Sequence, residues 1–117
     1  MTGKLIAEKW FDAFNRHHLE DLLSLYSDTA EHYSPKLKLR QPETNGLIQG
    51  KEQLRAWWSD SFKTLPSLRY YPNFIIYEGN KIFMEYLRKV DGQDDLIVGE
   101  LLVIEDDKIV ASKVYHS

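Results

Sequence analysis

Three segments in the last third of the chain alternate between apolar and polar residues and are joined by two short turns. The segments cover 81–90, 96–104 and 109–116, and the turns lie at Asp91-Gly92 and around Asp106-Asp107. Side chains on a strand point alternately to opposite faces of the sheet. The alternation therefore predicts two consecutive antiparallel hairpins, and it limits this part of the chain to a sheet whose two faces can be read separately.

One face of these hairpins is apolar at most positions but also carries carboxyl, guanidinium, phenol and imidazole groups. A closed core holds few unpaired polar groups, whereas a ligand pocket sets a small number of them in an apolar wall. The pattern predicts a pocket wall that contains Ile82, Met84, Tyr86, Arg88, Val98, Glu100, Leu102, Ser112, Val114 and His116.

The opposite face of the hairpins is also apolar in places. Its members include Phe83, Leu87, Ile97, Leu101, Val103 and Tyr115. A sheet face in contact with water normally carries polar residues, so this face is expected to be covered. The chain has no further segment to cover it, and we therefore expect a homodimer that forms through the outer sheet face.

The first two thirds of the chain contain helical patterns. Apolar residues recur at spacings of three and four over 3–16, 19–26 and 51–65, which predicts three helices. A short strand is expected over 29–34, a polar loop over 36–49, and a long strand over 68–78 that Pro72 interrupts. The predicted fold class is α+β, with a cone-shaped, curved antiparallel sheet covered by three N-terminal helices that enclose a pocket.

The amino-acid composition of the chain argues against several classes of binding partner. The 117 residues suit a single domain over 1–117, and the net charge of -3 argues against a nucleic-acid partner. The chain has no cysteine, no apolar run of membrane-spanning length and no signal peptide, so we expect a cytoplasmic protein without membrane association. Aromatic residues make up 13% of the chain, which is typical of a large core or of a lined ligand cavity.

The chain resembles one known group of proteins in the order of its expected elements and in four short stretches of sequence. These stretches lie at 22–28, 31–35, 50–58 and 107–116. The chain is similar to the nuclear transport factor 2-like superfamily, which includes ketosteroid isomerase, the SnoaL-like polyketide cyclases and scytalone dehydratase. The resemblance covers nearly the whole chain and implies the cone-shaped fold. It does not imply one reaction, because this fold carries many unrelated activities.

The resemblance to ketosteroid isomerase can be followed residue by residue. It implies that Glu100 occupies the position of a protonated acid that donates a hydrogen bond to an oxyanion. Ser34 falls where that enzyme has its general-base aspartate, and Trp10 falls where it has its oxyanion tyrosine. Tyr26 and Trp58 fall on pocket tyrosines. Two catalytic groups are therefore lost, and steroid isomerisation by that mechanism is not expected.

Glu100 is the first candidate for catalysis. It lies between Val98 and Leu102 on the inner face, and burial would raise its pKa toward the range that suits acid or base work. An alternative interpretation is a diagonal salt bridge with Arg88, which would keep Glu100 ionised. Tyr86, expected opposite Glu100, and His32 are the candidate assisting residues, although His32 could equally be a hydrogen-bonded core residue.

Further residues are assigned to ligand binding rather than to catalysis. We expect no metal: His32, His116 and Glu100 could converge, but an unmetallated polar cluster explains them as well. His116 is expected in the pocket wall, with a solvated chain end as the alternative. Beside the hairpin residues, the expected ligand-binding set comprises Trp10, Phe14, Tyr26, Ser34, Trp58 and Phe62.

Two functions of different classes follow from these residues. The first is an isomerase, cyclase or dehydratase type of enzyme that moves a proton on a small hydrophobic molecule and needs no cofactor. The second is a non-catalytic ligand-binding or dimeric interaction module. The missing general base favours the second function, and the polar groups of the inner wall favour the first.

Overall fold

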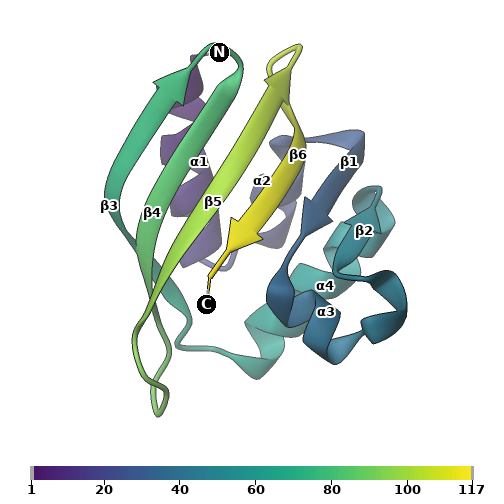
Figure 1. Cartoon of the computed structure of the whole chain (residues 1–117), viewed down its shortest axis with the longest axis vertical. Helices are drawn as coiled ribbons and strands as arrows, with labels where there is room; N and C mark the ends of the chain where they lie inside the picture. The colour runs from purple at the N-terminus through teal and green to yellow at the C-terminus, as the bar shows by residue number, and fades with distance from the viewer. Residues whose placement is uncertain (1, 117) are drawn as a thin grey trace.

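Six strands form one open, curved sheet that four α-helices and a short 3-10 helix accompany (Figure 1). The computed structural model describes residues 2–116 of the chain. In chain order the elements are α1 (Gly3–Asn15), α2 (Leu19–Ser24), β1 (Tyr26–Tyr33), α3 (Pro35–Arg40), η1 (Pro42–Thr44), β2 (Leu47–Gln49), α4 (Lys51–Thr64), β3 (Arg69–Glu78), β4 (Lys81–Lys89), β5 (Leu96–Glu105) and β6 (Lys108–Tyr115).

The strand order across the sheet is β2-β1-β6-β5-β4-β3. The two predicted hairpins are present, with β4 antiparallel to β5 and β5 antiparallel to β6. The sheet is not antiparallel throughout, because β1 pairs with β6 in parallel. Hairpin turns force an antiparallel arrangement, whereas β1 and β6 are joined by most of the chain, so their relative direction is free of that constraint.

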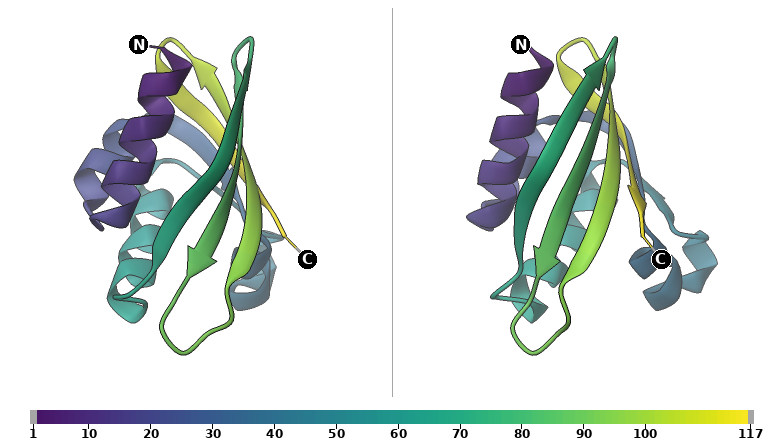
Figure 2. Two further views of the ribbon diagram at one scale, coloured as in Figure 1. Left: turned by 90° about the vertical axis from the view of Figure 1, so that its left-hand side faces the viewer. Right: turned by 60° about the vertical axis from the view of Figure 1, so that its left-hand side comes forward.

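The helices α1, α2 and α4 pack on the concave face of the sheet (Figure 2). The helix α1 begins at an N-cap, Thr2, whose hydroxyl accepts a hydrogen bond from the Leu5 amide at 3.2 Å. Its buried stripe consists of Ile6, Ala7, Trp10, Phe11, Ala13 and Phe14. In α4, the buried residues are Leu54, Trp57, Trp58 and Ser61. These stripes and the inner sheet face form the core.

The segment between β1 and α4 differs from the expected polar loop over 36–49. It contains α3, η1 and the three-residue strand β2, which extends the sheet beside β1. Ser34 caps α3 through a hydrogen bond from the Lys36 amide at 3.2 Å, and Pro35 occupies the first helical position. Only Leu37 and Ile48 bury apolar side chains here, so the segment shows too little periodicity to reveal its elements.

One further boundary differs in a way that affects the site. Helix α2 ends at Ser24, and Tyr26 begins β1 instead of ending the predicted helix. Pro72 interrupts β3 as expected, because the register shifts between Pro72 and Phe74 while the strand continues to Glu78. Proline is tolerated there because β3 is an edge strand. The α+β class and the curved sheet are confirmed, with four α-helices in place of the three expected.

Candidate functional site

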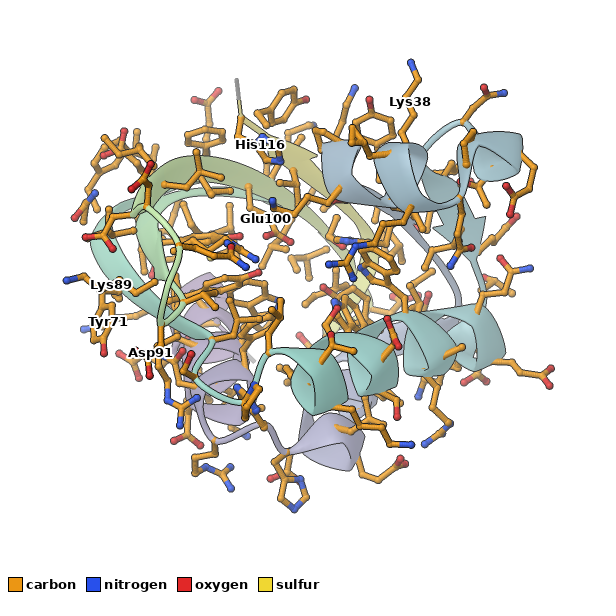
Figure 3. All side chains as sticks on the ribbon, turned by 90° about the horizontal axis from the view of Figure 1, so that it is seen from below. Lys38, Tyr71, Lys89, Asp91, Glu100 and His116 are labelled. Carbon is orange, nitrogen blue, oxygen red and sulfur yellow. The ribbon has the colours of Figure 1, made fainter. Side chains whose placement is uncertain are left out.

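Glu100 lies in the middle of β5 and points toward the interior between the sheet and the helices (Figure 3). In the register of the sheet it stands between Met84 on β4 and Val114 on β6. Its neighbours on the same face, Val98 and Leu102, are buried, and Glu100 itself is 2% exposed. The alternation of β5 therefore places a carboxyl group in apolar surroundings, as the sequence predicted.

One oxygen of the Glu100 carboxyl group is hydrogen-bonded and the other is not. The Tyr86 hydroxyl donates to Glu100 Oε1 at 2.7 Å, whereas Oε2 is buried without a hydrogen-bond partner among the described residues. Burial raises the pKa of Glu100 to about 7, and the hydrogen bond from Tyr86 opposes that shift. The carboxyl group therefore exchanges its proton near neutral pH, where acid and base roles are both accessible.

The alternative of a salt bridge between Arg88 and Glu100 is wrong. Glu100 faces Met84 directly, so Tyr86 is the diagonal neighbour and Arg88 lies one further step along the face. Nη1 of Arg88 donates to Gln93 Oε1 at 3.0 Å, and within residues 2–116 Glu100 has no ion pair within 4.0 Å. The register differs because the hairpin turns one residue earlier than the diagonal pairing requires.

A second set of buried polar side chains connects the helices α1 and α4 to the parallel strands β1 and β6. Trp10 Nε1 donates to the Tyr26 hydroxyl at 3.1 Å, and that hydroxyl donates to Ser112 Oγ at 3.2 Å. Ser112 Oγ lies 2.6 Å from His32 Nδ1, and the His32 ring lies 5.2 Å from that of Trp58.

The donors in this series of hydrogen bonds can be followed from Trp10 to Ser112. Indole can only donate, so the Tyr26 hydroxyl accepts from Trp10 and donates its own proton to Ser112 Oγ. Ser112 Oγ and His32 Nδ1 share the next hydrogen bond, in which either group can be the donor. Burial lowers the pKa of His32 to about 4, so the ring is neutral at pH 7.

Stacked aromatic rings form the wall beside Tyr86. Trp10 stacks on Phe14 and on Tyr70, and the Tyr70 ring lies 4.1 Å from the Tyr86 ring between centroids. Burial comes first among the causes that raise the pKa values of Tyr26, Tyr70 and Tyr86, so these phenols are donors at neutral pH. Tyr70 was missed in the sequence because the register shift beyond Pro72 breaks the alternation that would have placed it on the inner face.

The other expected site residues lie at different depths. Met84, Val98 and Leu102 are buried around Glu100, and Ser34 is buried where it caps α3. Phe62 is half-buried and packs on Phe14 at 5.2 Å, away from the carboxyl group. Val114 and His116 are half-buried toward the end of β6. The structure thus brings Tyr86 and Glu100 into contact and joins Tyr26, His32 and Ser112 separately.

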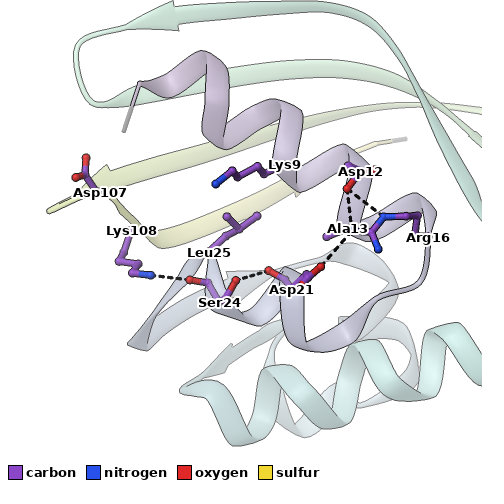
Figure 4. A pocket seen from close by; sticks show the side chains of 9 residues that line it. All are labelled: Lys9, Asp12, Ala13, Arg16, Asp21, Ser24, Leu25, Asp107 and Lys108. Atoms are coloured by element: carbon purple, nitrogen blue, oxygen red, sulfur yellow. Dashed lines mark hydrogen bonds and ion pairs between the residues drawn. The ribbon is translucent and has the colours of Figure 1, made fainter.

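Several hollows open on the surface. The one in Figure 4 has a volume of about 360 Å³ and lies between α1, α2 and the β5–β6 turn. Its charges are compensated, because Arg16 pairs with Asp12 at 2.8 Å and with Asp21 at 3.1 Å. None of the five described hollows includes Glu100 in its lining. The enclosed pocket beside Glu100 remains a prediction.

No three histidine, aspartate or glutamate side chains in the described part of the chain gather as metal ligands. Among residues 2–116, no helix has the length and apolar character needed to cross a membrane.

Known proteins share both the sequence pattern and the fold of this chain. The model of the SnoaL-like domain family matches residues 7–112. A search of curated proteins returned no match. The fold and the match together confirm the resemblance to the nuclear transport factor 2-like superfamily.

Solved structures share the whole architecture at low sequence identity. A SnoaL-like protein of unknown function from Burkholderia thailandensis is 23% identical, with a TM-score of 0.87 over 100% of this chain and 98% of the other. An NTF2-like protein from Burkholderia pseudomallei is 18% identical, with a TM-score of 0.86 over 100% and 92%. A hypothetical protein with a ketosteroid isomerase-like fold from Catenulispora acidiphila, in complex with trimethylamine, is 16% identical, with a TM-score of 0.78 over 99% and 88%. At these identities the likeness concerns the fold.

Proposed function

Since the chain belongs to the SnoaL-like domain family, we propose that it binds a small hydrophobic molecule beside Glu100 and moves a proton on that molecule without a cofactor. The reaction would be of the isomerase, cyclase or dehydratase type, in the cytoplasm. A structural neighbour in complex with trimethylamine supports the general idea of a small-molecule site in this fold.

The observation that carries the proposal is the buried Glu100 carboxyl group with one unpartnered oxygen. Oε2 accepts a proton from an acidic C–H group of the ligand, the resulting carboxylic acid exchanges its proton with solvent, and a proton then returns to a carbon or oxygen atom of the ligand, so the enzyme ends unchanged. A carboxyl pKa of about 7 makes both transfers accessible at neutral pH. Ser34 cannot replace the general base, because its hydroxyl already caps α3.

Tyr86 and His32 have supporting roles in this proposal. The Tyr86 hydroxyl fixes Glu100 Oε1 at 2.7 Å and so directs Oε2 toward the ligand, which makes Tyr86 a positioning residue. In the tautomer with its proton on Nε2, neutral His32 donates a hydrogen bond to a ligand oxygen as negative charge develops there. Trp10, Phe14, Tyr26 and Trp58 supply the apolar wall.

The test has two stages. A thermal-shift screen with small hydrophobic molecules that carry an acidic C–H group first finds compounds that raise Tm. NMR in D2O then follows hydrogen–deuterium exchange at that C–H group for the wild type, for Glu100→Gln and for the control Glu105→Gln, an exposed residue at the end of β5. Loss of a general base should slow exchange by roughly 10²- to 10⁴-fold in Glu100→Gln alone. Equal exchange in all three proteins would contradict the proposal.

One observation favours the alternative of a dimeric interaction module. The outer sheet face exposes apolar side chains, namely Tyr71, Phe74, Ile76, Ile97 and Tyr115. Compounds that bind without any Glu100-dependent exchange would favour this alternative, in which the interior serves binding only.

A further inference from the structure

Arg88 is the most buried cation among the described arginines and lysines. It is the last inward-facing residue of β4, stands between Tyr70 and Leu96 in the register, and is 6% exposed. Its only hydrogen bond within residues 2–116 goes to the neutral amide oxygen of Gln93, at 3.0 Å. In the same part of the chain, no carboxylate oxygen lies within 4.0 Å of its guanidinium group.

The absence of a counter-charge at Arg88 contrasts with the more exposed arginines. Arg16, Arg40 and Arg55 each pair with a carboxylate at the surface, where solvent already screens their charge. A guanidinium group stays protonated at any accessible pH, so a buried one retains the full cost of its desolvation until an anion pairs with it. The burial of Arg88 therefore lowers the stability of the fold, and no internal ion pair offsets this cost.

Lys36 places a second cation in the same region. It follows Pro35 in the first turn of α3, is partly buried, and has no ion pair with any described residue. Burial lowers its pKa, and the positive charges of Arg88 and Arg40 lower it further, so Lys36 lies within electrostatic range of both groups. Arg40 has Asp60 as its own partner at 3.7 Å, so Arg88 and Lys36 remain without an anion.

Glu100 does not supply the missing charge. The raised pKa of Glu100 has burial as its first cause and the Tyr86 hydrogen bond as its opposing one, with no contribution from Arg88. Arg88 is four residues along β4 from Met84, the neighbour of Glu100, which corresponds to roughly 13 Å along the strand. Tyr86 lies between these two stations, Arg88 and Glu100, on the same face of the sheet.

We propose that Arg88, assisted by Lys36, binds a carboxylate group of the ligand whose reacting carbon lies beside Glu100. The inference rests on the proposed function and narrows its substrate class to an apolar ring system with a carboxylate at the end remote from the reacting carbon. The planar guanidinium fork can hold both carboxylate oxygens at once, which fixes orientation as well as affinity. Tyr70, which pairs with Arg88 in the register and stacks on Tyr86, provides apolar surface between the two stations.

A panel of bicyclic carboxylates and their matched amides tests the proposal, with 2-naphthoate and 2-naphthamide as the reference pair. Each pair has the same ring system and differs in charge. Dissociation constants are measured by titration calorimetry for the wild type, for Arg88→Met and for the control Lys89→Met. Lys89 is the next residue on β4 and is exposed at the end of that strand (Figure 3). The substitution Lys89→Met therefore removes the same charge as Arg88→Met.

The wild type and Lys89→Met should bind at least one carboxylate about tenfold or more tightly than its amide. Arg88→Met should lose that preference while its affinity for the amide stays unchanged. The inference is overturned if no carboxylate in the panel binds the wild type more tightly than its amide, or if Arg88→Met keeps the preference.

A second readout separates ligand binding from a structural role of Arg88. Without ligand, Arg88→Met should unfold at the same Tm as the wild type or at a higher one, because a desolvated charge without a counter-charge is removed. A clearly lower Tm would assign Arg88 to the scaffold and overturn the proposal.

The two proposals can fail separately. Arg88-dependent binding of carboxylates without Glu100-dependent exchange would contradict the proton transfer alone. Glu100-dependent exchange on neutral molecules, with no preference for carboxylates, would contradict the role of Arg88 alone.

Discussion

Two buried residues with opposite pKa shifts, Glu100 and His32, determine how stability depends on pH. Glu100 has a pKa of about 7 against an ordinary value of 4.5, so between these values the folded state binds more protons than the unfolded state. Its contribution to the free energy of unfolding is therefore full below pH 4.5 and is lost as the pH rises through 7. His32 has a pKa of about 4 against 6.5, so its contribution is present above pH 6.5 and is lost as the pH falls through 4.

These two contributions oppose each other between pH 4.5 and 6.5, and single substitutions should reveal them. Relative to the wild type, the free energy of unfolding of Glu100→Gln should rise by roughly 3 kcal/mol between pH 4.5 and 7. That of His32→Asn should fall by a similar amount between pH 4 and 6.5. Urea denaturation from pH 4 to 8 measures both differences. Difference curves that are flat with pH would mean that neither group is held in its unfavoured charge state.

At this scale the sequence predicted a good part of the site and missed some of its connections. Alternation alone placed Glu100 and Tyr86 on one inner face, because hairpin neighbours follow from local pattern and turn position. The contact between His32 and Ser112 required the parallel pairing of β1 with β6, which no local pattern specifies. The Arg88–Glu100 pairing failed because a shift of one position in the turn changes every diagonal partner.

At the scale of elements, the segment from α3 to β2 depends on one glycine. Gly46 has a φ of +85°, and its carbonyl oxygen accepts a hydrogen bond from the Ser34 amide at 3.0 Å. A Cβ atom at this position would lie 2.8 Å from the Tyr33 ring and 3.1 Å from the Ser34 carbonyl oxygen. The close approach of this turn to β1 therefore requires glycine.

Gly46→Ala should lower the free energy of unfolding by about 1–3 kcal/mol more than Gly92→Ala does. Gly92 is the matched control because its φ is +81°, while a Cβ atom there would meet nothing within 4 Å. Both substitutions carry the cost of a positive φ, so their difference isolates the steric contact. Chemical denaturation of the two variants measures it, and equal losses would show that the turn can move away from Tyr33.

The elements that the sequence revealed are those with long, regular patterns. α1, α4 and the two hairpins each bury several residues at a constant period, and their bounds agree with expectation within one or two positions. The elements α3, η1 and β2 are held by a cap, a proline and one glycine turn rather than by periodic burial. A short helix of this kind is determined by its contacts with β1, which the sequence shows only after the sheet is known.

At the scale of the whole molecule, the outer sheet face remains the predicted dimer surface. Ile97 is 61% exposed there, and Ile76 is 53% exposed two strands away. We expect sedimentation velocity at micromolar concentration to show a dimer for the wild type and a monomer for Ile97→Lys, because a lysine in an apolar interface would lose its hydration.

Leu39→Lys is the control for that experiment. Leu39 is 78% exposed on α3, so this variant gains the same charge away from the outer sheet face and should remain dimeric. A monomeric wild type, or equal dissociation in both variants, would contradict the prediction.

The central position of β6 in the sheet has a consequence for the order in which the chain folds in a cell. β6 emerges from the ribosome after the other five strands, yet it occupies an interior place between β1 and β5. Until β6 is in place, the β2-β1 pair and the β5-β4-β3 meander are two separate parts of the sheet. In each part, the strand next to the position of β6 has an unpaired edge. Glu100, which pairs with Val114 of β6, and His32, which contacts Ser112 of β6, therefore become part of one interior only when β6 takes its place between the two parts.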